Sequence, residues 1–191
     1  MEIEMGKLST LSSAARLIVL SVAVLGLLGS SAVYAQDVAV GSATATVQAV
    51  LSVTATSALA FSTVYQGIPK SIANNNASAG VFTITGQGGA GVAVYMQLPD
   101  YLSTATGDDR MVIAFSTSDA SMDSTSNTDP TSFGSGWQNT DPHNFPAATT
   151  VGTVGQNQSA IFLGGKVIPT VDQAAGAYTG DIVLTVAYNG S

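Results

Sequence analysis

The sequence has no cysteine among its 191 residues, so no disulfide can form and a zinc site would lack its usual sulfur ligands. It has one histidine, one tryptophan and only five lysines and arginines. Both glutamates fall within the first four residues, so the rest of the chain has none. Glutamate, lysine and arginine usually fill helix surfaces, and their scarcity argues against a helical protein. Stability must come from a packed core or from partners.

Glycine, serine, threonine, alanine and valine dominate what is present, and they favour a nearly all-β fold. After residue 35 the chain carries three basic residues against ten aspartates, a formal charge of −7. An acidic surface of this kind repels phosphate backbones. No nucleic-acid partner is therefore expected.

The N-terminal segment has the organisation of a secretory signal peptide. Lys7 and Arg16 precede an apolar block at residues 17–28, and Val33 and Ala35 supply small side chains for cleavage. Cleavage after Ala35 is predicted, which leaves a mature chain that starts at Gln36 and is secreted through the periplasm to the cell surface or beyond. A retained membrane anchor is the alternative. Glycines and serines interrupt it between residues 26 and 31, so no stable membrane insertion is expected after cleavage.

Apolar residues alternate with polar ones over residues 43–55, the period of a half-buried strand. Further strands are predicted at 81–85, at 111–115, near 158–163 and at 182–188. Residues 86–91 are rich in glycine, and they predict a turn from which residues 92–98 return as the partner of 81–85. Short strands at this spacing indicate a β-sandwich.

The mature chain fits a single domain, preceded by an extension. The predicted organisation is a signal peptide at 1–35, an N-terminal extension at 36–50 and a β-sandwich domain at 51–191. The domain contains a polar insertion at about 103–155, which is rich in serine, threonine, aspartate and glycine. Such a stretch is typically a functional surface or a variable decoration.

Several short motifs carry a resemblance to a known group of proteins. They are Ala-Thr-Ala-Thr-Val at 43–47, Leu-Ala-Phe-Ser-Thr-Val at 59–64, Leu-Gly-Gly at 163–165, Ala-Gly-Ala-Tyr-Thr-Gly at 175–180 and Val-Ala-Tyr at 186–188. With these motifs in this order, the chain resembles an uncharacterised family of bacterial secreted pilin-like domains. That family is related in pattern to spore coat U type proteins and to chaperone-usher fimbrial subunits.

The resemblance implies an immunoglobulin-like sandwich with an incomplete sheet, completed by strand exchange between subunits. Residues 36–50 then form the donor strand, with small side chains at alternate positions. The partners would be other copies of the chain, with a periplasmic chaperone and an outer-membrane usher. The residues implicated in polymerisation are Ala43, Ala45, Val47, Ala49, Gly176 and Tyr188. Two simpler interpretations remain open: residues 36–50 as a first strand within their own domain, and Tyr188 as an aromatic cap on an edge strand.

Residues capable of catalysis are few, and no enzyme and no cofactor are expected. His143 lies two residues after Asp141, but no Gly-x-Ser-x-Gly elbow accompanies them. Calcium is the one metal that the residue types suit, because side chains with oxygen ligands are plentiful. The weak candidates are Asp108, Asp109 and Asp123, although scattered aspartates usually only solvate a surface.

Trp137 could form a sugar-stacking platform with Tyr95, Tyr101 or Phe133, or it could pack a loop onto the sandwich. The sequence therefore predicts a structural subunit of an extracellular fimbria-like fibre or biofilm surface layer, assembled by β-strand addition. The alternative is a monomeric secreted adhesin or glycan-binding module.

Overall fold

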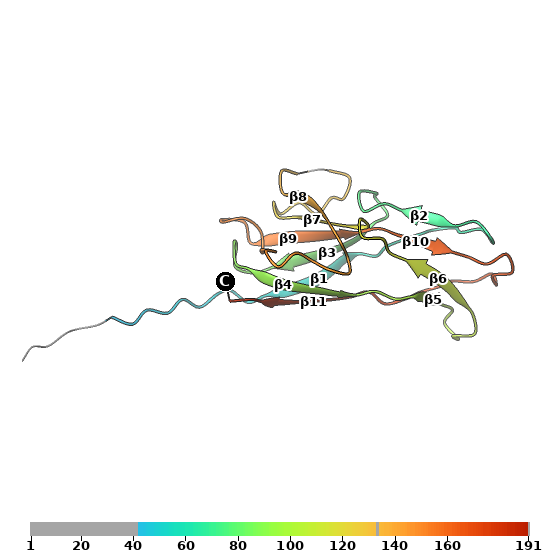
Figure 1. Cartoon of the computed structure of the whole chain (residues 1–191), viewed down its shortest axis with the longest axis horizontal. Helices are drawn as coiled ribbons and strands as arrows, with labels where there is room; N and C mark the ends of the chain where they lie inside the picture. Colours follow the sequence, from blue (N-terminus) through green and yellow to red (C-terminus); the bar gives the residue numbers. More distant parts are fainter. Residues whose placement is uncertain (1–41, 133, 191) are drawn as a thin grey trace, which may run out of the picture. The chain divides into compact units, whose positions relative to one another are not determined.

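The computed structural model describes residues 42–132 and 134–190 (Figure 1). The chain divides into two units, and the second begins at Thr46. Of the first unit only residues 42–45 are described; they are exposed and have no regular secondary structure. The predicted signal peptide and residues 36–41 lie outside the described residues. The fold that follows is that of the second unit.

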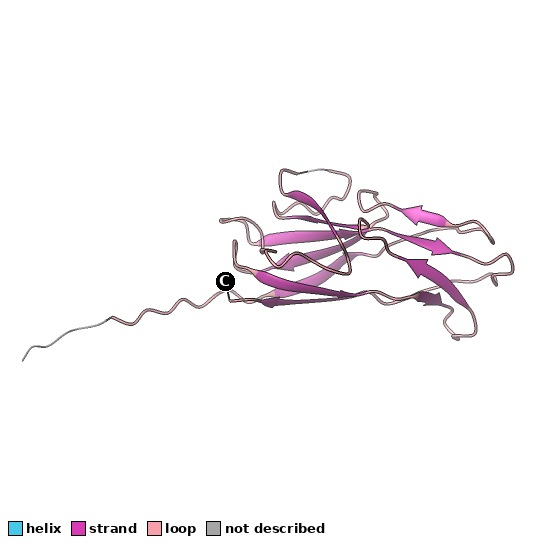
Figure 2. Ribbon diagram, in the orientation of Figure 1, coloured by secondary structure: helices cyan, strands magenta, loops and turns pink. Residues whose placement is uncertain are grey.

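Every regular element among the described residues is a β-strand, and the strands pair antiparallel (Figure 2). The predicted all-β fold is therefore confirmed, and its sheets pack as a sandwich. The largest sheet has the order β1-β3-β9-β7-β8. Its strands are β1 (Ser52–Ser57), β3 (Gly80–Thr85), β9 (Gln158–Leu163), β7 (Ala120–Asp123) and β8 (Trp137–Thr140).

Two smaller sheets complete the unit. One has the order β2-β10-β6-β5, and the other is the pair β11-β4. Their strands are β2 (Lys70–Ile72), β10 (Gly165–Ile168), β6 (Arg110–Ala114), β5 (Tyr101–Ser103), β11 (Val183–Tyr188) and β4 (Val92–Gln97).

Gly164 is the only residue between β9 and β10, and at this residue the chain passes from the largest sheet into the β2-β10-β6-β5 sheet. A Cβ at this position would lie 2.4 Å from the carbonyl oxygen of Ile72, closer than a carbon atom can approach. Gly164 of the Leu-Gly-Gly motif is thus a crossing point between sheets, where only glycine fits.

The main core lies between the first sheet and the β4–β11 pair. Ile84 and Ile161 from the first sheet and Val92 from β4 are fully buried there. A second core, which includes Met111, Ile113 and Val167, lies against the β2-β10-β6-β5 sheet. Strands β6 and β11 present alternate apolar residues inward, as the period of two requires, whereas β9 is buried on both faces.

Three expectations about local structure differ from what is observed. The alternation over 43–55 becomes a strand only from Ser52, and residues 46–50 lie exposed without regular structure. Strands β3 and β4 do not form the predicted hairpin, because β3 pairs with β1 and β9 while β4 pairs with β11. The glycine-rich connection crosses between layers, and both strands still bury their apolar faces in one core. Within the polar stretch 103–155, β6 confirms the strand predicted at 111–115, whereas β7 and β8 were not predicted.

Candidate functional site

One side of the sandwich has two strand edges that are not hydrogen-bonded to each other. Strand β1 is hydrogen-bonded to β3 but lies at the edge of its sheet, and β11 is bonded only to β4. The chain continues from β1 through residues 58–66, and it enters β11 through residues 173–182. We call residues 51–66 the first wall, residues 173–188 the second wall and the gap between them the seam.

The two walls run in opposite directions. At one end, Leu51 and Tyr188 both lie against Gly86, where an added Cβ would approach both side chains. At the other end, Gln66 is hydrogen-bonded to Gln173. The step from 51 to 66 and the step from 188 to 173 are both fifteen residues, so the walls match in length. A strand placed between them would lie antiparallel to one wall and parallel to the other.

Backbone groups on the seam side of the walls have no partner across the gap. In the described part of the chain no backbone hydrogen bond joins residues 58–66 to residues 173–182. The first wall also bends at Ser62, whose φ of 54° is unusual for a residue other than glycine. Edges of this kind are templates for pairing with another strand.

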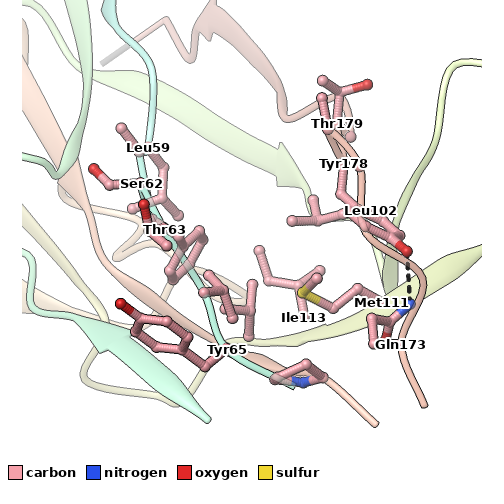
Figure 3. A pocket seen from close by; sticks show the side chains of 18 of the residues that line it. Leu59, Ser62, Thr63, Tyr65, Leu102, Met111, Ile113, Gln173, Tyr178 and Thr179 are labelled. Carbon is pink, nitrogen blue, oxygen red and sulfur yellow. Dashed lines mark hydrogen bonds between the residues drawn. The ribbon is translucent and has the colours of Figure 1, made fainter. Parts of the chain in front are cut away.

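A hollow of about 920 Å³ opens between the walls. Figure 3 shows Leu59 and Tyr65 on the first wall facing Tyr178 and Thr179 on the second, with Met111 and Ile113 between them. Alanines line much of the second wall, at positions 174, 175 and 177. The hollow is therefore apolar at its base, and the second wall contributes several small side chains to its rim.

The core is incompletely covered along the seam. Leu184 and Val186 point inward from β11 but are only half-buried, whereas Ile84 and Ile161 on the neighbouring sheet are fully buried. Val53 on β1 is half-buried in the same way. Covering such apolar surface contributes about 25 cal/mol per Å² removed from water. An occupant of the seam would gain this stabilisation.

The end of the seam at Gln66 is closed by polar contacts. The Gln66 Nε2 donates to the backbone carbonyl of Gln173 at 2.6 Å. One residue further, the amide of Gly67 donates to the carbonyl of Thr170 at 2.9 Å, a direct backbone contact between the two chain segments. The walls therefore meet here.

A hydrogen-bonded network holds the second wall in place near this end. The Asp109 carboxylate accepts from the Ala174 amide at 2.9 Å and from the Tyr178 hydroxyl at 2.6 Å. The Gln173 Nε2 donates to the Tyr178 hydroxyl and to the Arg110 carbonyl. The Tyr178 hydrogen bond, followed by the Ala174 one, holds the pKa of Asp109 below its ordinary value of 3.8. Burial and the Asp109 contact raise the pKa of Tyr178 above its ordinary 10.0.

Tyr188 lies at the opposite end of the seam. Its hydroxyl donates to the Ala49 carbonyl at 2.8 Å and accepts from the Gln87 amide at 2.7 Å. A Cβ on Gly86 would lie 2.5 Å from this hydroxyl, so glycine is required for the contact. Tyr188 thus joins the last strand to the chain just before β1.

The residues predicted for polymerisation fall in two places. Gly176 and Tyr188 belong to the second wall, and Gly176 lines the hollow. Val47 and Ala49 lie on the exposed segment before β1, with the Val47 side chain 93% exposed. Ala43 and Ala45 belong to the separately described residues 42–45 and are also exposed.

The structure gives Trp137 a packing role. Its ring stacks on Phe162 with centroids 4.9 Å apart and an angle of 15° between planes. Together they cover Val81 and Ala160 on the largest sheet. Tyr95 and Tyr101 lie in the other two sheets, on β4 and β5, and Phe133 lies outside the described residues.

The predicted ionisable candidates are dispersed or already engaged. Asp108 and Asp109 precede β6, whereas Asp123 is buried at the end of β7 and accepts a hydrogen bond from the Thr125 amide. In residues 42–132 and 134–190 no three acidic, histidine or cysteine side chains gather as metal ligands would. Asp141 accepts from the backbone amide of His143, and the His143 Nε2 bonds to the Phe115 carbonyl.

Gln66, Gln173 and the Asp109–Tyr178 contact were not singled out by the sequence, although Tyr178 lies in the motif at 175–180. Comparison of the chain with models of protein families, with curated proteins and with solved structures gives no significant match. None of the described residues forms a helix long and apolar enough to cross a membrane.

Proposed function

We propose that the protein is a structural subunit of an extracellular fimbria-like fibre or biofilm surface layer, assembled by β-strand addition. The observation that carries this proposal is the seam: two antiparallel edges, unpaired across the gap, beside an apolar hollow and a half-covered core. A strand that enters the seam would pair with free edges and cover the core in one step. The resemblance of the sequence motifs to pilin-like domains supports the same conclusion.

The donor would be the segment at residues 36–50 of a second copy. Its described part, from residue 42, is exposed and carries no charge. Alternate positions hold Ala43, Ala45, Val47 and Ala49, so one face presents small apolar side chains. Such small side chains would let the strand lie close to the second wall, where alanines line the rim of the hollow.

An unfilled seam is a liability before assembly, since free edges and apolar surface invite aggregation. We therefore propose a periplasmic chaperone that covers the seam and an outer-membrane usher that receives the subunit. The sandwich is proposed to be immunoglobulin-like and the protein to act outside the cell. Strand addition needs neither catalysis nor a cofactor.

The test is assembly of the exported chain, followed by size-exclusion chromatography and negative-stain electron microscopy. Fibres or ladders are expected from the intact protein, and deletion of residues 36–47 should abolish them. Equal assembly by the deleted form would overturn the donor assignment.

A finer test uses the two faces of the donor segment. Replacing Ala45 and Val47 together with aspartate places charge on the small apolar face and should block assembly. Replacing Thr44 and Thr46 with aspartate adds the same charge on the opposite face and should leave most assembly intact. Equal loss in both pairs would mean that charge alone, and not the alternation of side chains, controls assembly.

If the intact protein stays monomeric, that result favours the alternative of a secreted adhesin. A glycan array on the monomer, with Trp137→Ala as the comparison, then tests it. Because Trp137 is stacked on Phe162, that comparison needs a folding control by circular dichroism.

A further inference from the structure

We infer that Gln66 and Gln173 form a stop in the seam, which limits how far an added strand can enter and thereby sets its register. The inference rests on the proposed function, because a register exists only if the seam takes a strand. It concerns which residues determine the fit and not whether a strand binds.

The stop is visible as a change in how the walls are connected. Along residues 58–65 the walls are separated by the hollow. At Gln66 a side chain spans the gap to the carbonyl of Gln173 at 2.6 Å, and at Gly67 the backbones themselves bond. A strand that advances along the hollow therefore meets a closed end.

The two glutamines differ in how firmly they are held. Gln173 is 4% exposed, and its side chain is bonded to Arg110, Thr170 and Tyr178, so it is fixed by the fold. Gln66 is exposed, and its amide reaches Gln173 from the first wall. Gln66 is therefore the half of the stop that can be removed without disturbing the core.

A stop is needed because the donor's own side chains specify register weakly. Residues 43–46 repeat Ala-Thr, so a shift of two residues places an alanine where an alanine was. Shifts of one residue turn the apolar face outward and are excluded, but shifts of two keep the same face inward. Side-chain fit distinguishes these registers poorly, whereas a closed end distinguishes them sharply.

Disulfide mapping tests the inference cleanly, because the chain has no cysteine of its own. One exported copy carries Ala177→Cys, on the rim of the hollow. A second carries a single cysteine at position 43, 45 or 47. Mixed assemblies are oxidised, and cross-linked dimers are counted for each donor position. One donor position should dominate.

In the Gln66→Ala background only the Gly67–Thr170 backbone bond, one residue further, still closes the end, so donor positions other than the dominant one should also cross-link. Gln66→Lys keeps a donor long enough to reach the Gln173 carbonyl and should restore a single position. Gln97→Ala removes a glutamine from the exposed side of β4 and should change nothing. Circular dichroism confirms that each variant is folded.

The outcomes separate the two proposals. If the protein with an unsubstituted seam does not assemble, both strand addition and the stop are overturned. Assembly with several donor positions cross-linked from the start would overturn the stop alone. A single position that Gln66→Ala leaves unchanged would also overturn it.

Discussion

The hydroxyl of Tyr188 joins the last strand of the domain to the chain before its first strand, through a 2.8 Å hydrogen bond to the Ala49 carbonyl. The same oxygen accepts from the Gln87 amide, so one side chain ties three segments together. These segments are up to 139 residues apart in sequence. Tyr188 is therefore more than an aromatic cap on an edge strand.

Tyr188→Phe removes both hydrogen bonds and keeps the ring. The free energy of unfolding should fall by about 1 kcal/mol, the usual net contribution when water can replace part of the loss. Urea denaturation measures this change in the free energy of unfolding. Tyr95→Phe, at an exposed position on β4, is the control and should change stability by less than about 0.5 kcal/mol. Equal effects of the two substitutions would contradict the role given to the Tyr188 hydroxyl.

Gly86→Ala places a methyl group 2.5 Å from the Tyr188 hydroxyl. The clash should cost about 1–3 kcal/mol, since the backbone or the ring must move. In a Tyr188→Phe background the clashing oxygen is gone, so the cost of Gly86→Ala should be smaller. A double-mutant cycle by urea denaturation measures this coupling. Equal costs in the two backgrounds would show that the strain lies elsewhere, for example at Leu51.

The Asp109 contacts predict a dependence of stability on acid. Because the folded state lowers the pKa of Asp109, the carboxylate stabilises the fold above its ordinary pKa of 3.8. That contribution is lost as the pH falls through the lowered folded value. Asp109→Asn should lower the melting temperature at pH 7 and flatten its fall toward pH ~3. Thermal melts across this range measure it.

Asp108→Asn is the matched control, because it removes a neighbouring charge while Asp109 keeps its contacts with Ala174 and Tyr178. It should leave the acid profile of the wild type unchanged. If Asp108→Asn flattens the profile as much as Asp109→Asn, general charge repulsion and not the network would be responsible.

Trp137→Ala should destabilise the fold by about 2–3 kcal/mol, because it uncovers Phe162 and its apolar neighbours. Trp137→Phe keeps a stacked ring and should recover about half of the loss. Denaturation followed by far-ultraviolet circular dichroism measures both. Among molecules that remain folded, assembly should be unchanged, since Trp137 lies on β8, at the edge of the largest sheet opposite to β1. A stable but non-assembling Trp137→Ala protein would contradict this picture.

The sequence predicted the strand at the end of the chain well. Alternation over 182–188 corresponds to β11, and Leu184 and Val186 point inward as expected. Their incomplete burial was not predictable from alternation, because it depends on the absence of a neighbour on one edge. The same holds for residues 43–51: their alternation is a strand signal, but strand structure begins only where β3 offers a partner.

The long-range contacts could not be predicted from the sequence, for a different reason. Residues 86–91 indicated a turn correctly, but a turn does not say in which sheet the next strand pairs. Gln66 and Gln173 are 107 residues apart and belong to no recognisable motif. Their contact exists only because the two walls converge, which no local pattern encodes. Trp137 was ambiguous because a lone aromatic residue suits either a binding surface or a packed loop.

The bond between Tyr188 and Ala49 has a mechanical consequence. Tension applied to residues 46–50 would reach β1 through the backbone and β11 through the tyrosine hydroxyl. These two strands belong to different sheets, so the load divides between both layers of the sandwich. Because β1 and β11 run in opposite directions, the pull acts along their lengths and must shear many hydrogen bonds together. A domain held in this way resists peeling from one edge.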